Sequence, residues 1–130
     1  MRLESLGAAV MLAVVSVLPP RSSARHHLLQ PSAKATAAVT NHNTLDVDVF
    51  ILAGGARFRL GTVVTSQSQE FDIPAQAVNT GSVRISADPI GARVAYTSDQ
   101  LSIGDGDRIR LTVSPQLTQS VVIVERGAGR

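Results

Sequence analysis

The sequence predicts an all-β fold: an antiparallel, immunoglobulin-like β-sandwich of seven or eight short strands over residues 39–125. Three observations support this. Apolar and polar residues alternate from Val39 onward, the two-residue period of a half-buried strand. Turn signals recur at spacings of about 8–12 residues, as in sandwiches and barrels. A chain of 130 residues, 44% of them hydrophobic, can also bury a single packed core.

Residues 1–24 are predicted to be a signal-peptide helix. An apolar run extends from Leu6 to Leu18 and ends at Pro19-Pro20. This is the length of a signal-peptide core, whereas a membrane-spanning helix needs ~20 residues. Small residues allow cleavage after Ala24, and the triplet Ala35-Thr36-Ala37 offers a later site. A short membrane anchor and a buried core helix are the alternatives for this run.

Two further segments are predicted to lie outside the sandwich. Residues 25–38 are rich in Ser, Ala and Pro and have no period, so we expect a flexible linker or an extended leader. Residues 126–130 form a short Gly-containing segment, which we expect to be a flexible tail. Cleavage of the predicted signal peptide would leave a secreted or periplasmic protein without a stable membrane anchor.

The clearest local structure is a hairpin around Gly54-Gly55, because two glycines supply the positive φ angles of a tight turn. Pairing Ala53 with Ala56 predicts the facing pairs Ile51–Phe58, Val49–Leu60 and Val47–Thr62. Arg59 then reaches Asp48 diagonally on the opposite face. The predicted core comprises Val47, Val49, Ile51, Phe58, Leu60, Ile109, Leu111 and Val113.

The other strands are expected at residues 39–41, 70–73, 82–87, 92–97, 101–103, 108–114 and 118–125, with one helical turn at 75–78. The last strand is apolar on both faces over Val121–Val124, so it must be central, covered, or paired with another chain. We expect strand 82–87 or the strand near Val39 to pair with it, giving a monomer. An open edge that recruits a partner is the alternative.

Part of the chain resembles a group of small, uncharacterised secreted bacterial β-sandwich proteins. The similarity rests on Asn41-His-Asn43, Asp46-Val-Asp-Val49 with Phe50, and Gly55 followed by Arg57-Phe-Arg59-Leu-Gly61-Thr-Val63. It covers residues 39–91. Where members often have an aromatic before the first Asp, this chain has Thr44-Leu45. The resemblance implies export and a β-sandwich, and it implies no chemistry.

Composition excludes several classes of function. The chain has no Cys, which removes disulfides, thiolate metal sites and Cys nucleophiles. Residues 39–125 carry six Arg against nine Asp and Glu, so the basic stripe expected of a nucleic-acid-binding protein is absent. No spacing of His, Asp or Glu matches a metal site or a nucleophile–base pair. We therefore expect no cofactor, no metal and no catalytic residues.

The residues predicted to bind a partner are His42, Phe50, Asp88, Asp99 and Asp105. Phe50 lies on the hairpin face opposite the core, where it is either an exposed apolar contact or is covered by other parts of the chain. The other four lie in predicted loops or at strand ends. Asp105 belongs to Gly104-Asp-Gly-Asp107, which we interpret as a turn because the spacing of a calcium loop is missing.

These observations predict an exported, non-enzymatic β-sandwich that acts as a binding or structural module, with an unknown protein or envelope component as its partner. The alternative is a secreted small-ligand or carbohydrate-binding domain with its site in the loops at one end of the sandwich. A hydrolase is disfavoured because no nucleophile and base are recognisable in the sequence.

Overall fold

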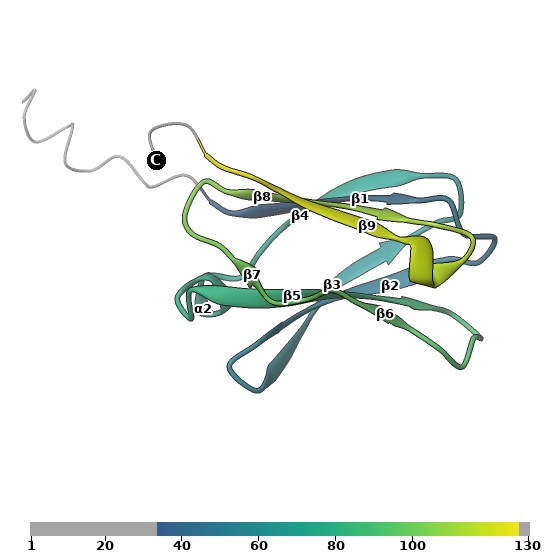
Figure 1. The fold of residues 1–130 in the computed structure, drawn as a ribbon, viewed down its shortest axis with the longest axis horizontal. Helices are drawn as coiled ribbons and strands as arrows, with labels where there is room; N and C mark the ends of the chain where they lie inside the picture. The colour runs from purple at the N-terminus through teal and green to yellow at the C-terminus, as the bar shows by residue number, and fades with distance from the viewer. Residues whose placement is uncertain (1–33, 128–130) are drawn as a thin grey trace, which may run out of the picture. The chain divides into compact units, whose positions relative to one another are not determined.

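The computed structural model describes residues 34–127, which form two β-sheets packed face to face (Figure 1). The first sheet has the order β4-β1-β8-β9, with β1 Thr36–Asn41, β4 Ser68–Asp72, β8 Arg108–Val113 and β9 Val121–Glu125. The second has the order β3-β2-β5-β6, with β2 Val47–Ala53, β3 Ala56–Val63, β5 Ser82–Pro89 and β6 Tyr96–Thr97; β7, Leu101–Ser102, also pairs with β5. The predicted all-β, two-layer class is confirmed.

The core fills the space between the sheets and is built from the alternating inward residues of each strand. Val47, Val49, Ile51, Ile109, Leu111 and Val113 are fully buried, as the two-residue period predicts. Phe58 and Leu60 are only partly buried, although both pack against the same cluster. Both residues belong to β3, the edge strand of the second sheet, which fewer neighbours cover.

The hairpin of β2 and β3 follows the predicted register only near its turn. Gly54 and Gly55 have φ angles of 58° and 81°, as a tight two-residue turn requires. Ala53 faces Ala56 and Ile51 faces Phe58, as predicted. Beyond Phe50 the register shifts, so that Val49 faces Gly61 and Val47 faces Val63. The predicted pairs Val49–Leu60 and Val47–Thr62 are therefore wrong, because Leu60 is an extra residue in a β-bulge.

The bulge lies where the two sheets approach closely. The Phe71 ring of β4 lies so close to Gly61 that a Cβ added there would be 2.6 Å from Cε1 of Phe71. Only a glycine admits this approach without movement of the ring or the strand. The shift also brings Thr62 opposite Asp48, which accepts hydrogen bonds from the Thr62 hydroxyl and, at 2.9 Å, from Arg59 Nη2. The predicted contact of Arg59 with Asp48 is confirmed.

The predicted antiparallel arrangement is wrong for one pair of strands. β1 runs antiparallel to β4 but parallel to β8, with Thr36 beside Arg108 and Asn41 beside Val113. Parallel neighbours need a long connection, and the whole second sheet lies between β1 and β8 in the chain. All other strand pairs are antiparallel.

The strand opening the first sheet begins three residues earlier than predicted. Residues 36–38 belong to β1 instead of the linker, and Ala35, Ala37 and Val39 are buried in alternation. Alanine is a weak strand former, which hid this alternation in the sequence. The predicted signal-peptide helix at 1–24 and residues 25–33 of the linker lie outside the described residues.

The remaining elements differ mainly in length. β5 continues to Pro89, whereas the strand predicted at 92–97 is reduced to Tyr96–Thr97. Residues 117–119 form a short 3-10 helix, η2 (Leu117–Gln119), before β9, and the predicted helical turn is α2, Ala75–Val78. No helix within residues 34–127 is long and apolar enough to cross a membrane.

The start of the predicted tail is held by a buried carboxylate. Asp107 is fully buried, and its side chain accepts hydrogen bonds from the backbone N–H of Gly104 at 3.0 Å and of Gly127 at 2.9 Å. Arg126 Nη1 forms an ion pair with it at 2.9 Å. Residues 126 and 127 are thus part of the packed domain, contrary to the prediction, and 128–130 lie outside the described residues.

Candidate functional site

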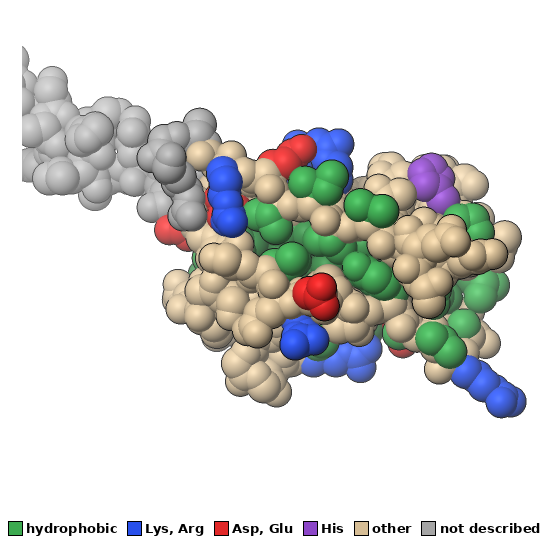
Figure 2. Space-filling view, viewed as in Figure 1, with side chains coloured by type: hydrophobic (Ala, Val, Ile, Leu, Met, Phe, Trp, Pro, Cys, Tyr) green, Lys and Arg blue, Asp and Glu red, His purple; other side chains and the backbone are tan. Residues whose placement is uncertain are grey.

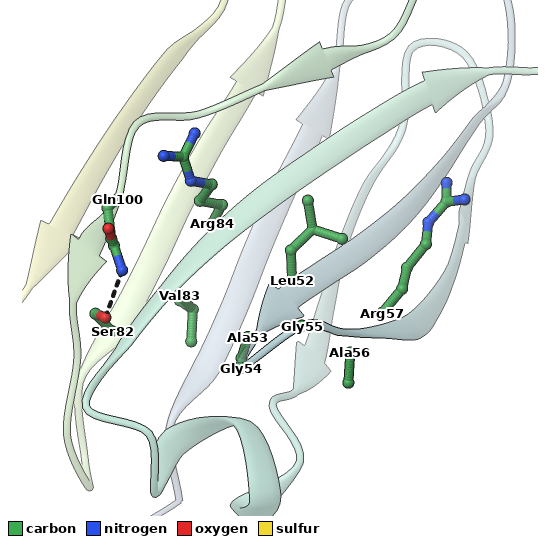
Figure 3. Close-up of a pocket in the computed structure, with 10 residues that line it drawn as sticks. All are labelled: Leu52, Ala53, Gly54, Gly55, Ala56, Arg57, Ser82, Val83, Arg84 and Gln100. Atoms are coloured by element: carbon green, nitrogen blue, oxygen red, sulfur yellow. Dashed lines mark hydrogen bonds between the residues drawn. The ribbon is translucent and has the colours of Figure 1, made fainter.

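The outer face of the second sheet carries a row of three side chains across three strands. Leu52 of β2 faces Arg57 of β3 on one side and Arg84 of β5 on the other. Directly paired residues of neighbouring strands project to the same face. Figure 3 shows Arg57, Leu52 and Arg84 rising on the same side of the sheet. The two arginine Cα atoms are separated by two strand spacings, about 10 Å.

A shallow cavity of about 360 Å³ lies beside this row, next to the hairpin turn (Figure 3). Its lining residues are Leu52, Ala53, Gly54, Gly55, Ala56, Arg57, Ser82, Val83, Arg84 and Gln100. None of these residues is acidic, so the two guanidinium groups give the cavity a positive charge. The side of the cavity facing β7 is fixed by a hydrogen bond of 2.7 Å from Gln100 Nε2 to Ser82 Oγ.

Within residues 34–127, three arginines have no acidic partner, Arg57, Arg84 and Arg93, and only the first two line the cavity. Arg59, Arg108, Arg110 and Arg126 each form an ion pair at 2.8–2.9 Å. Within residues 34–127, neither Arg84 nor Arg57 has an ion pair or side-chain hydrogen bond, and Cζ of Arg57 lies 3.7 Å from the centroid of the Phe50 ring. Both guanidinium groups therefore retain their hydrogen-bond donors for a ligand.

The cation–π contact also explains where Phe50 lies. This residue was predicted to project away from the core, and it is half-buried on the outer face of the second sheet. Its ring lies beneath the Arg57 guanidinium and so holds that group on the outer face of the sheet. Phe50 is the one predicted binding residue that adjoins the site, as a support for Arg57.

The other predicted binding residues do not gather into one site. Asp88 lies on the same outer face, opposite Asp48, at the far end of the β2–β5 pair from Arg84. Asp99 is exposed between β6 and β7, where its charge adds to burial in raising the pKa of Tyr96. Asp105 is exposed in the turn before β8, beside a second cavity of about 530 Å³.

His42 lies at the opposite end of the parallel strand pair from Asp105. Its backbone N–H donates to Val113 O beyond the end of β1, whereas Asp105 precedes β8. His42 is exposed, and the asparagines on either side of it serve the fold. No three His, Asp or Glu side chains between residues 34 and 127 are placed to hold a metal ion.

The two asparagines connect the sheets. Asn41 is fully buried, and its Nδ2 donates to Leu45 O at 2.9 Å and to Val63 O at 3.0 Å. Its Oδ1 accepts the backbone N–H of Asn43 at 2.8 Å. Asn43 in turn donates to Ser114 O at 3.1 Å. The Asn41-His-Asn43 motif is therefore a structural clamp, as the tendency of Asn to bond local backbone predicts.

Sequence reasoning missed Arg84 and Leu52 as site residues. The hairpin register did place Arg57 opposite Leu52, since both lie within three residues of the Gly54-Gly55 turn. The pairing of β2 with β5 is non-local, and nothing in the sequence indicated that Arg84 would complete the row. A lone arginine in a short strand carries no such signal.

Comparison with known proteins adds little to this description. No protein-family model matches the chain, and no curated protein matches it. One solved structure that it resembles is an NMR structure of a protein from Eubacterium rectale. That structure is 14% identical, has a TM-score of 0.46, and the alignment covers 75% of this chain and 93% of the other.

Proposed function

We propose that this chain is an exported, non-enzymatic domain of immunoglobulin-like type that binds a carboxylate-bearing ligand through Arg57 and Arg84. The observation that carries the proposal is the pair of arginines without acidic partners on either side of Leu52. Guanidinium groups recognise carboxylates through two parallel hydrogen bonds. A ligand with two acidic groups can engage both arginines while its apolar part covers Leu52.

The arrangement of the aromatic side chains favours this ligand over a neutral sugar. Carbohydrate sites typically present exposed aromatic rings for stacking. Phe58, Phe71 and Tyr96 pack against the core, and Phe50 lies beneath Arg57. A carbohydrate-binding site in the end loops therefore has less support than an acidic ligand on the sheet face.

Binding is tested by titrating the full chain with an acidic oligopeptide and, separately, with an oligosaccharide of uronic acids, using calorimetry at physiological salt. We expect Arg84→Gln to weaken binding of the preferred probe about tenfold or more, because it removes charge-assisted hydrogen bonds. Arg93→Gln is the matched control, since Arg93 is exposed and lies outside the cavity. Equal losses in the two variants, or no binding of either probe, would contradict the proposed site.

Export rests on the apolar run from Leu6 to Leu18 and the small residues before Ala24, all outside the described residues. The test is cell fractionation of the full chain, followed by N-terminal sequencing of the product. We expect periplasmic or extracellular protein that begins near residue 25, because cleavage after Ala37 would remove Ala35 and Ala37 from the core. Cytosolic protein that retains Met1 would refute export without bearing on the arginine site.

A further inference from the structure

β9 is an edge strand with one free side. It pairs with β8 from Thr112↔Val121 to Arg108↔Glu125, and within residues 34–127 it has no other strand beside it. Neither of the neighbours that the sequence suggested is present: β5 lies in the second sheet, and β1 pairs with β8 and β4. An edge strand presents backbone donors and acceptors that can pair with another strand. The topology thus removes the reason for expecting a monomer.

The outward side chains of β9 are as apolar as the inward ones. Val122 and Val124 pack against the core, whereas Val121 and Ile123 project from the outer face and are 52% and 53% exposed. β9 lies in front in Figures 1 and 2, and hydrophobic side chains gather along the middle of this face in Figure 2. Water contacts these groups unless another surface covers them.

The charged residues that could protect this edge are already engaged within the chain. Glu125 forms an ion pair with Arg110 at 2.9 Å. Arg126 binds Asp107 and also donates to Ser102 O at 3.0 Å. Natural sheets usually protect an edge with a charge, a proline, a bulge or a short strand. β9 has five residues, no proline and no bulge, so none of these devices blocks it.

We propose that β9 pairs antiparallel with β9 of a second copy of this chain, about a two-fold axis at Ile123. This register pairs Ile123 with Ile123 of the second copy and Val122 with its Val124. All five residues of β9 take part, and η2 stays outside the paired segment. The inward side chains of both copies then lie on the same side, so the two first sheets form one continuous sheet.

Self-complementarity favours a second copy over an unrelated strand. The two-fold axis places apolar residues opposite each other at the centre, and it never places like charges opposite each other. The charges nearest the strand are neutralised within each copy by Arg110 and Asp107. Because a five-residue strand pair is small, we expect a weak dimer whose population rises with concentration.

Cysteine cross-linking tests the register, because the chain has no cysteine of its own. In the proposed dimer, the two Ile123 Cα atoms lie about 5 Å apart, within the range for a disulfide. Ile123→Cys should therefore form a covalent dimer under mild oxidation. The matched control is Val121→Cys, because the two Val121 Cα atoms would be about 14 Å apart. Equal cross-linking of the two variants would overturn the proposal.

Sedimentation of the full chain over a range of concentrations tests dimerisation itself. We expect the wild-type mass to double with concentration, and Ile123→Lys to raise the dissociation constant about tenfold or more, since two lysines would meet at the axis. Val64→Lys is the control, because Val64 is 50% exposed but lies outside β9. Thermal melts verify that both variants fold. A wild-type protein that stays monomeric at ~1 mM, far above the range of a typical weak complex, would overturn the proposal.

Discussion

The two edges of the first sheet have opposite characters. β4 places Ser68, Glu70 and Asp72 on its outer face, opposite Thr40, Ala38 and Thr36 of β1. β9 places Val121 and Ile123 on the same face at the other edge. On the β4 side the Phe71 ring also packs on Gly61 of the second sheet, which closes the sandwich there. On the β9 side, Val122 and Val124 reach the core while the outer face stays apolar.

This contrast shows that the residues of β9 make its outer face apolar, since the same fold accepts a polar outer face at β4. Both strands flank the same β1–β8 pair, and in both the side chains project alternately toward the core and toward the outer face. At β4 the outward side chains are polar or charged, so a partner strand would cover no apolar group there. At β9 a partner strand would cover Val121 and Ile123. A partner strand is therefore expected at β9 and not at β4.

The largest expected effect is on the free energy of unfolding, and it concerns the aspartates at the ends of the two edge strands. Asp107, fully buried, binds the segment that follows β9, whereas Asp72 of β4 forms an exposed ion pair with Lys34 at 3.7 Å. Asp107→Ala should lower the free energy of unfolding by about 3 kcal/mol, because buried donors lose their acceptor. Asp72→Ala should change it by less than about 0.5 kcal/mol. Urea denaturation of both variants measures the difference, and similar losses would mean that Asp107 does not anchor β9.

A second experiment makes β4 resemble β9. The double variant Ser68→Val with Glu70→Ile removes the Glu70–Arg108 ion pair of 2.8 Å and gives β4 two outward apolar residues. With two apolar edges per chain, association no longer closes at a dimer, so light scattering should detect larger oligomers. Ser68→Thr with Glu70→Gln is the control that keeps the edge polar. Unchanged mass in the double variant would show that outward side chains do not govern pairing.

The smallest expected effect concerns β3, the edge of the second sheet. The Thr62 hydroxyl bonded to Asp48, together with Arg59, lowers the pKa of Asp48 below its ordinary value, although desolvation opposes this shift. Because the folded pKa is the lower one, the associated stability is present above the unfolded pKa of about 3.9 and is lost as pH falls through the folded pKa. The contribution should be below about 1 kcal/mol, as Arg59 is mostly exposed.

Urea denaturation of the wild type and of Asp48→Asn between pH 7 and pH 2 measures this contribution. The variant should be less stable at pH 7, and the difference should shrink as Asp48 becomes protonated in the wild type. A difference that does not change with pH would mean that the charge of Asp48 contributes nothing.

Local features of the sequence predicted much of the hairpin, the clamp and the core. The turn at Gly54-Gly55, the first pairs of β2 with β3, and the contact of Arg59 with Asp48 all follow from residues close in the chain. A two-residue turn determines the register beside it, and alternation determines which face is buried. The same alternation predicted that Ile109, Leu111 and Val113 are buried. Of the candidate site, these local signals predicted the placement of Phe50 and Arg57 on the outer face.

Only the tertiary structure decided the bulge at Leu60, the parallel pairing of β1 with β8, the row that Arg84 completes, and the edge position of β9. Each depends on contacts between residues far apart in the sequence. The Phe71 ring, for example, sits against Gly61 only once the two sheets have packed. A strand that is apolar on both faces, such as β9, fits a central or an edge position equally well. Its place follows from the combined packing and loop-closure free energies of the whole chain, which local patterns do not contain.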